Sequence, residues 1–363
     1  MAEIGFGLAL AVGSQSALGT INATVQALAG ALGITNGILL GDASGTGESG
    51  FDFAVAREAR DQADVSLSFT AQPATFLRRT VETFTIALQL KGAGTVALAG
   101  LAASPVVDGD LDISVNYPGL YALLRASGWV GAADAGATDA FILTPEDAVP
   151  FTAKLWSGQG SNAVASVLMD CIVNSLSIDF TPGEVAVATF ECQGTVVSQT
   201  GGTTAPTLTF GHIASISAPT LISAGHSFGI GAAARDFESL TLTISQEVEE
   251  TGASNSPTGK RQRQTRRRIT FDAVILADTG DDDFEEALLA TTSAPTADLI
   301  FNLWGPTAAA VAPSGEVRSL TIEVLNVEIK RIVEAKVGSA KARQISGQAT
   351  GPTAESEARI IFI

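Results

Sequence analysis

The sequence predicts a mainly β protein with two tandem homologous domains of the β-barrel or β-sandwich kind, each with a short α-helix and a long protruding hairpin or loop. Composition, the alternation of apolar and polar residues, and an internal repeat predict this fold. Of the 363 residues, 46% are hydrophobic and only 6% are aromatic, and Gly, Ala, Val, Thr and Ser dominate. That mix favours many short strands joined by tight turns over a bundle of helices.

The internal repeat relates residues 53–69 (FAVAREARDQADVSLSF) to residues 228–244 (FGIGAAARDFESLTLTI). The two segments align without a gap at a constant offset of 175, so that Leu67 matches Leu242. Each segment closes on apolar and polar residues in alternation, which is the pattern of a half-buried strand.

Four further pairs of segments follow in the same order in the two halves. Two of the pairs predict strands, one predicts short helices that begin near Pro118 and Asp282, and the last is a long alternating segment. A proline in the first turn and an acid at the N-cap are favoured helix starts. The pairs are 84–90 with 270–276, 120–128 with 284–292, 151–156 with 299–304, and 174–194 with 318–337.

Five matches in one order predict a duplicated domain. We expect a first domain at residues 1–200 and a second at 201–363, joined by a linker at 198–207 (SQTGGTTAPT) that is rich in Gly, Thr and Pro. Within the first closing segment, residues 181–184 (TPGE) predict a hairpin turn with Pro and Gly at its centre.

No constellation of residues predicts an enzyme, a cofactor site or a metal site. The glycines at 45–50 (GTGESG) fit G-x-G-x-x-G, but no acid follows the next strand and no Lys follows the glycines, so we expect a plain loop. His212 and His226 lack a neighbouring Cys or serine elbow. Residues 278–289 (DTGDDDFEEALL) lack the ligand spacing of a calcium loop.

The remaining rare residues have structural interpretations. We expect Cys171 and Cys192 to be buried, reduced thiols. Trp156 and Trp304 occupy equivalent places in the two halves, which predicts a shared core position. The apolar N-terminus opens with Glu3 and has no basic region, so we expect neither a signal peptide nor a membrane span.

The charges are few and unevenly placed. A net charge of −17 argues against nucleic-acid binding by the whole surface, and 16% charged residues suits surfaces buried within an assembly. Six of the 21 basic residues nevertheless lie within nine positions between two strand-like runs, so we expect residues 251–268 to form the tip of a long hairpin. These six are Lys260, Arg261, Arg263, Arg266, Arg267 and Arg268.

Several segments resemble the tail tube proteins, or major tail proteins, of flexible-tailed, siphovirus-like bacteriophages. The resemblance rests on an alternating opening strand at 4–20 (IGFGLALAVGSQSALGT), a short helix at 118–129 (PGLYALLRASGW) followed by ILTPED at 142–147, and a closing hairpin at 173–196. It covers most of the first half and, through the repeat, the second half more loosely. The family is expected to be mainly β and to build hollow tubes.

The resemblance implies a structural virion protein rather than an enzyme. Members with one domain are expected to form hexameric rings, and a duplicated member is similar to those that form trimers with a pseudo-sixfold ring. Such rings stack into a tube through which DNA leaves the capsid without specific binding. The implied partners are other copies of the chain and the tail terminator, tape-measure and distal tail proteins. The implied location is the phage tail, assembled in the host cytoplasm without membrane contact.

Three explanations of the basic run remain open. It forms a solvated loop, it contacts nucleic acid or carries a nuclear address, or it docks along the tube axis on an acidic surface of the neighbouring ring. We favour the third, with Asp281, Asp282 and Asp283 as the acidic surface. The matching connection of the first half holds only Arg78 and Arg79.

A carbohydrate-binding or adhesion protein of tandem β-sandwiches is the alternative function. Such proteins display clustered surface aromatics, whereas this chain has only two Tyr and three Trp.

Overall fold

The structure is a computed structural model. It describes residues 8–16, 19–27, 33–35, 38–40, 67–68, 81–90, 118–132, 139–143, 148–157, 162–181, 186–203, 207–209, 227–230, 233–252, 260–276, 296–304, 319–349 and 358–362.

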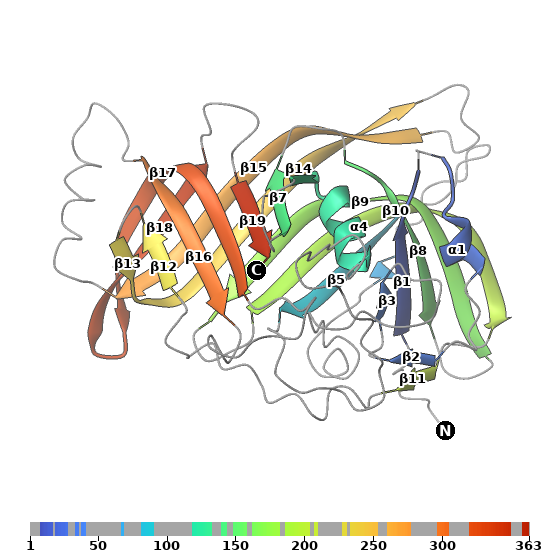
Figure 1. The fold of residues 1–363 in the computed structure, drawn as a ribbon, viewed down its shortest axis with the longest axis horizontal. Coiled ribbons are helices and arrows are strands. Elements are labelled where there is room, and N and C mark those ends of the chain that lie inside the picture. Colours follow the sequence, from blue (N-terminus) through green and yellow to red (C-terminus); the bar gives the residue numbers. More distant parts are fainter. Residues whose placement is uncertain are drawn as a thin grey trace.

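Most of the described chain belongs to one curled, mainly antiparallel sheet that forms a half-barrel (Figure 1). Seventeen of the described strands pair within it, and a separate parallel pair consists of β2 (Gly33–Thr35) and β11 (Thr207–Thr209). Two helices are described, the short α1 (Ala23–Ala27) and the longer α4 (Pro118–Ala126). The mainly β prediction is therefore confirmed.

Six strands of the first half lie side by side in an order that differs from their order along the chain. Each strand pairs antiparallel with the next, and β3 (Ile38–Leu40) adds a parallel pairing to the last one. The order is β4 (Leu67–Ser68), β5 (Val81–Leu90), β10 (Ala186–Thr203), β9 (Ala163–Phe180), β8 (Phe151–Ser157) and β1 (Leu8–Ser14).

Six strands of the second half follow a corresponding order. β13 (Ala233–Arg235) adds a pairing to the last of them, and β19 (Ala358–Phe362) continues along β17 beyond the end of β18. The order is β14 (Phe237–Gly252), β15 (Lys260–Leu276), β18 (Ala340–Ala349), β17 (Ser319–Val337), β16 (Thr296–Trp304) and β12 (Ser227–Ile230).

The register of the two sets corresponds around one shared bulge. Each set has a bulge that skips one residue in the strand register, Asn174 of β9 against β10 and Lys330 of β17 against β18, at the same step of each ladder. One row of directly opposite residues then crosses each set of four strands. The rows are Leu67–Phe84–Cys192–Val173 and Leu242–Phe271–Gly347–Ile329.

The two sets join into one sheet at a seam between β9 and β14. Six residue pairs form this seam, from Leu240 opposite Phe180 to Ser245 opposite Ser175. A second junction pairs β19 with β7 (Asp139–Leu143), which in turn pairs with β6 (Trp129–Ala132). Both junctions are antiparallel, so strand pairing alone makes the sheet continuous.

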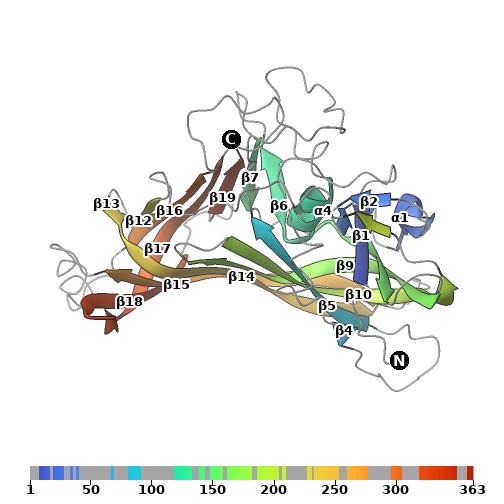
Figure 2. The ribbon, with the colours of Figure 1, turned by 90° about the horizontal axis from the view of Figure 1, so that it is seen from below.

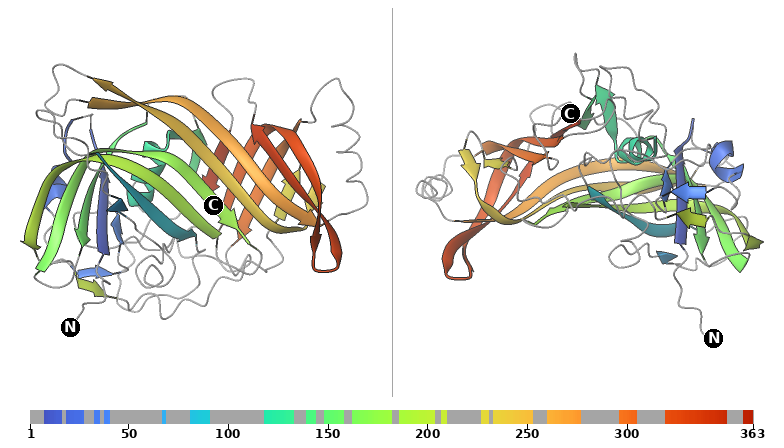
Figure 3. Two further views of the ribbon diagram at one scale, coloured as in Figure 1. Left: turned by 180° about the vertical axis from the view of Figure 1, so that it is seen from behind. Right: turned by 60° about the horizontal axis from the view of Figure 1, so that its bottom comes forward.

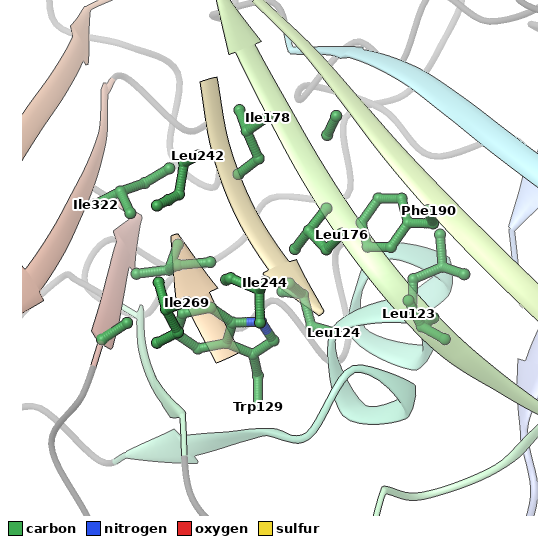
Figure 4. Packing of buried hydrophobic residues seen from close by; sticks show 14 of the residues in the cluster. Leu123, Leu124, Trp129, Leu176, Ile178, Phe190, Leu242, Ile244, Ile269 and Ile322 are labelled. Atoms are coloured by element: carbon green, nitrogen blue, oxygen red, sulfur yellow. The ribbon is translucent and has the colours of Figure 1, made fainter. Parts of the chain in front are cut away.

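Helix α4 lies on one face of the sheet, next to β6 and β7, which join the sheet through β19 (Figures 2 and 3). Its apolar side contributes Leu123 and Leu124 to the core, and the fully buried Trp129 follows directly on β6. These residues pack over the seam against the buried side chains of β9 and β14 (Figure 4). Burial of each such large apolar side chain contributes about 1.5–3 kcal/mol, so the helix holds the seam closed.

Local sequence sets the ends of α4. Pro118 occupies its first position, as predicted, because proline lacks only an N–H that the first turn leaves unpaired. Gly128 ends the helix with a φ of 85°, a left-handed conformation that glycine adopts without strain. The Arg125 guanidinium lies in the last turn and donates to the Trp129 carbonyl at 3.2 Å, which satisfies an acceptor beyond the helix.

Other local predictions meet mixed outcomes. The predicted hairpin is confirmed by the antiparallel pairing of β9, which ends at Phe180, with β10, which begins at Ala186, while residues 182–184 of the predicted turn lie outside the described residues. The linker prediction at 198–207 is wrong for residues 198–203, which continue β10 and pair with β9 across a bulge. Alternating Ser, Gln and Thr supply side chains that an exposed strand end tolerates, so the Gly pair there does not end the strand.

The equivalence of the two tryptophans is wrong by two residues. Ala153 lies opposite Leu168 and Leu299 lies opposite Val324, at matching bulges of β9 and β17. Counting from these pairs, Asn302 takes the register position of Trp156, and Trp304 comes two residues later. The pairing with β9 and β17, which the sequence motif does not reveal, sets these positions. Trp156 itself is buried as predicted.

No described helix is long and apolar enough to span a membrane. The helix predicted at 284–292 lies outside the described residues, and so does the segment 53–61 of the repeat.

Candidate functional site

Small polar side chains cover the sheet face that points away from α4. Along β9, Leu176, Ile178 and Phe180 are buried in the core, so the alternating residues point to the opposite side. We call this side the polar face. Its central strands carry Ser175, Ser177, Asp179, Thr189, Glu191, Gln193, Thr241, Thr243, Ser245, Arg268, Thr270 and Asp272.

The polar face runs without a break across the seam. Thr243 of β14 lies opposite Ser177 of β9, which lies opposite Thr189 of β10. One residue row away, the Thr241 hydroxyl donates to Asp179 Oδ1 at 2.7 Å. Short hydroxyl side chains therefore form a flat surface that spans strands from both halves.

Carboxylates outnumber cations at the centre of this face. Asp179, Glu191 and Asp272 are exposed, whereas Arg268 is the exposed cation among the polar-face residues. Further out, β17 adds exposed Lys330 and Arg331. A surface of this kind repels phosphates weakly and offers no aromatic stacking platform among its described side chains.

The hairpin of β14 and β15 extends beyond the sheet as a two-stranded ribbon. Residues 246–252 and 260–267 pair with each other and with no other described strand, because β9 stops pairing at Ser245 and β18 stops at Thr270. We call this extension the ribbon. Figure 1 shows it running past the paired part of β9.

Five of the six basic residues, from Lys260 to Arg267, lie on the second arm of the ribbon, and Arg268 follows at its base on the polar face. The expectation that residues 251–268 form a hairpin tip is therefore wrong for the described part of that range. Lys260 begins β15, and the described strands are interrupted only between Gly252 and Lys260. Acidic residues of β14 stand opposite the basic ones: Glu247 is opposite Arg266 and Glu249 is opposite Arg263. Opposite charges directly across an antiparallel pair stabilise it by about 0.2–1 kcal/mol each, which favours continued pairing.

The base of the ribbon is tied to the end of α4. Buried Gln246 donates from Nε2 to the carbonyl oxygen of Ser127, and the Ser127 hydroxyl donates to the Leu123 carbonyl at 2.8 Å. Arg267 stands directly opposite Gln246 on β15. The sequence does not reveal the role of Gln246, because a lone glutamine within an alternating strand gives no signal of burial.

A second buried polar group holds the segment after β1. The Asp170 carboxylate accepts a hydrogen bond from the Gly19 main-chain N–H at 2.7 Å, and the Asp170 main-chain N–H donates to Gln15 Oε1 at 2.9 Å. Both side chains are buried, so these bonds satisfy groups that water does not reach. The arrangement is structural and connects β1 to β9.

Both cysteines are buried and unlinked, as predicted. Burial raises the pKa of each thiol well above its ordinary value, and the mutual charge repulsion of the two thiolates raises that of Cys171 further. Lys154 donates to the Gln26 carbonyl at 2.8 Å, and partial burial lowers its pKa. No cluster of His, Cys, Asp and Glu within the described part of the chain has the composition of a metal site.

Several predicted site residues lie outside the described residues. They include the acidic surface and the basic pair of the first half, Asp281, Asp282, Asp283, Arg78 and Arg79. The glycines at 45–50 and both histidines, His212 and His226, also lie outside them.

Comparison of the chain with protein-family models and with curated protein sequences finds no match.

Proposed function

We propose that the protein is a structural subunit of a phage tail tube, which polymerises as stacked rings into a hollow conduit for genome ejection. The observation that carries this proposal is the repeated strand order, which makes the curled sheet from two similar sets of strands. A sheet whose similar units are joined by strand pairing is suited to extension around a ring.

The duplicated domain is part of the same proposal. Matching strand order, matching bulges and the matching residue rows support two homologous domains, residues 1–200 and 201–363, that meet at the β9–β14 seam. Three such chains supply six similar units, so we infer a trimeric ring with pseudo-sixfold symmetry. The second predicted helix would complete the likeness of the halves.

The polar face forms the wall of the lumen in this proposal. A conduit must let DNA slide without gripping it, and short hydroxyls with an excess of carboxylates suit that task. The opposite face carries the apolar core and α4, which a wall in contact with water would not present. DNA therefore passes without specific binding.

The ribbon makes the contact between rings. Basic positions outnumber acidic ones along its two arms even after the opposite Glu residues are taken into account, so it carries positive charge into an otherwise acidic protein. Such a projection would dock on an acidic surface of the next ring, near 281–283, and fix the register of stacking. Exposed ion pairs contribute about 0.2–1 kcal/mol each, so they orient the rings more than they bind them.

The remaining expectations follow from the same proposal. The partners are other copies of the chain and the tail terminator, tape-measure and distal tail proteins. The site of action is the virion tail, assembled in the host cytoplasm.

A tandem carbohydrate-binding protein is the weaker candidate. Glycan binding relies on exposed aromatic rings, whereas Trp129 and Trp156 are both buried. The side chain of Trp304 lies outside the described ones.

Sedimentation and negative-stain electron microscopy of the purified chain test the proposal. We expect large assemblies that appear as hollow tubes or rings. A species that stays monomeric at high concentration across a range of salt, and that binds a glycan array, would replace the tube with the carbohydrate-binding function.

A further inference from the structure

Among the described strands, one edge of β17 has no pairing strand at a place where the corresponding edge of β9 has one. Residues 331–337 of β17 pair with β18 on one side, while β16 pairs with β17 only up to Glu328. Among the described strands, none pairs with the other side of this stretch. Val333 lies within it and is 36% exposed, the one exposed large hydrophobic side chain among the described residues.

The corresponding stretch of β9 shows what covers such an edge. Residues 175–179 of β9 also pair with a hairpin partner on one side, β10, and lie beyond the segment that pairs with β8. Their other side is covered by β14, which forms the seam. The seam therefore displays, within one chain, the strand pairing that the β17 edge lacks.

The strand equivalent to β14 is β4. Leu67 of β4 lies opposite Phe84 and Leu242 of β14 lies opposite Phe271, in corresponding rows of the two halves. β4 pairs with β5 alone among the described strands, so the edge that β14 gives to the seam is unpaired in β4. Among the described strands, the first half thus leaves one edge of β4 unpaired, and the second half leaves one edge of β17 unpaired.

We propose that residues 331–337 of β17 pair antiparallel with β4 of a second copy of this chain, and that this contact repeats the seam between chains. The inference rests on the proposed ring and names the surface that closes it. The seam register predicts the partners. Because Thr243 lies opposite Ser177, Ser68 of the second copy should lie opposite Val333, and Leu67 opposite Glu334.

A second junction supports the same head-to-tail arrangement. Within the chain, β7 pairs with β19. β19 lies beside the first part of β17, just as the end of β10 lies beside the first part of β9. The β10 residues 196–200 pair with β9 but with no other described strand, and Ser198, Gln199 and Thr200 are exposed. Among the described strands, both junctions therefore have a counterpart that lacks its pairing strand, the end of β10 for one and residues 331–337 of β17 for the other.

The edge is suited to a second copy more than to an arbitrary strand. Its main-chain groups offer a ladder of hydrogen bonds to an added strand. Exposed Arg331, Glu334 and Lys336 discourage indiscriminate pairing, since charges on an edge oppose aggregation. A head-to-tail contact between unlike edges closes a ring when the rotation between units permits it.

Disulfide trapping tests the predicted register. The full-length double variant Ser68→Cys with Val333→Cys places two thiols at directly opposite positions on two chains. The native Cys171 and Cys192 are 0% and 1% exposed, so they do not compete for mild oxidation. The matched control is Ser177→Cys with Thr243→Cys, the equivalent pair within one chain.

After mild oxidation, denaturing gels without reductant should show covalent multimers of the first variant and only cross-linked monomer of the control. Each single-cysteine variant should lose the multimers. Rings seen by microscopy without covalent multimers, while the control cross-links, would overturn this interface and leave the ring proposal standing. If multimers form without rings, the edge pairing is supported and the ring is contradicted. If neither rings nor multimers form, both proposals are overturned.

Discussion

Asp170 on β9 and Asn326 on β17 adopt the same left-handed backbone conformation, with φ of 53° and 50°. They are the two non-glycine residues with positive φ among the described residues. Each lies within a bulge. β9 advances three residues, from Leu168 to Cys171, while β8 advances two, and β17 advances three residues, from Val324 to Val327, while β16 advances two. Short Asp and Asn side chains enter this conformation at least cost, so the two halves use one device to bend a long strand.

Asn326 gives a direct test of that device. Asn326→Val should lower the free energy of unfolding by about 1–3 kcal/mol, because a β-branched residue is strained at positive φ. Asn326→Gly should change it by less than about 1 kcal/mol, because glycine adopts this conformation freely. Urea unfolding followed by circular dichroism measures both. Equal stability of the two variants would show that the bulge does not depend on this backbone conformation.

Gly347 should resist enlargement. A Cβ added there would lie 2.4 Å from Phe271 Cε1 and 2.6 Å from the Glu328 carbonyl oxygen, and the backbone oxygen cannot move aside cheaply. Gly347→Ala should therefore destabilise the protein by about 1–3 kcal/mol. Gly201→Ala is the matched control, because nothing lies within 4 Å of its added Cβ. Thermal unfolding compares the two, and an unaffected melting temperature for Gly347→Ala would mean that Phe271 does not pack over this glycine.

The buried thiols predict a loss of stability in alkali. Burial raises the folded-state pKa of Cys171 and Cys192, so the folded protein keeps both protons where the unfolded chain releases them. Stability from this source is complete below the ordinary thiol pKa of about 8.5 and falls above it, by up to about 1.4 kcal/mol per pH unit for each thiol. Urea unfolding between pH 7.5 and pH 10 measures the slope. The double variant Cys171→Ala with Cys192→Ala should show a shallower slope, and an unchanged slope would contradict the assignment.

The basic arm of the ribbon should act in stacking and not in ring closure. The triple variant Arg266→Ala, Arg267→Ala, Arg268→Ala should form rings but give short tubes, because the charge that meets the next ring is reduced. Lys330→Ala with Lys341→Ala, two exposed basic residues away from the ribbon, should leave tube length unchanged. Tube lengths from electron micrographs decide the matter. Tubes of normal length from the folded triple variant would contradict a role in stacking and leave the arginines a role within the ribbon itself.

The sequence predicted the parts of the fold that depend on local pattern. Alternation in SLSIDF and LTLTI placed strands correctly, Pro118 marked a helix start, and the offset of 175 matched Leu67 to Leu242, which occupy corresponding rows. These features succeed because each depends on neighbouring residues alone.

Long-range register escaped the sequence. The pairing of β8 with β9 and of β16 with β17 puts Trp304 two positions beyond the counterpart of Trp156, and the extension of β10 through Thr203 contradicted a Gly-rich linker. The acids of β14 opposite Arg263 and Arg266 turned an expected loop tip into a strand arm. The polar face was visible as alternating Ser and Thr, but only strand order shows that it crosses the seam.

Rotationally averaged electron cryomicroscopy of end-on tubes tests the central claim most directly. We expect a hollow ring with threefold symmetry and six similar lobes, in which the polar face lines the lumen and α4 lies on the outer side. A density in which α4 faces the lumen, or a chain that forms no ring at all, would contradict it.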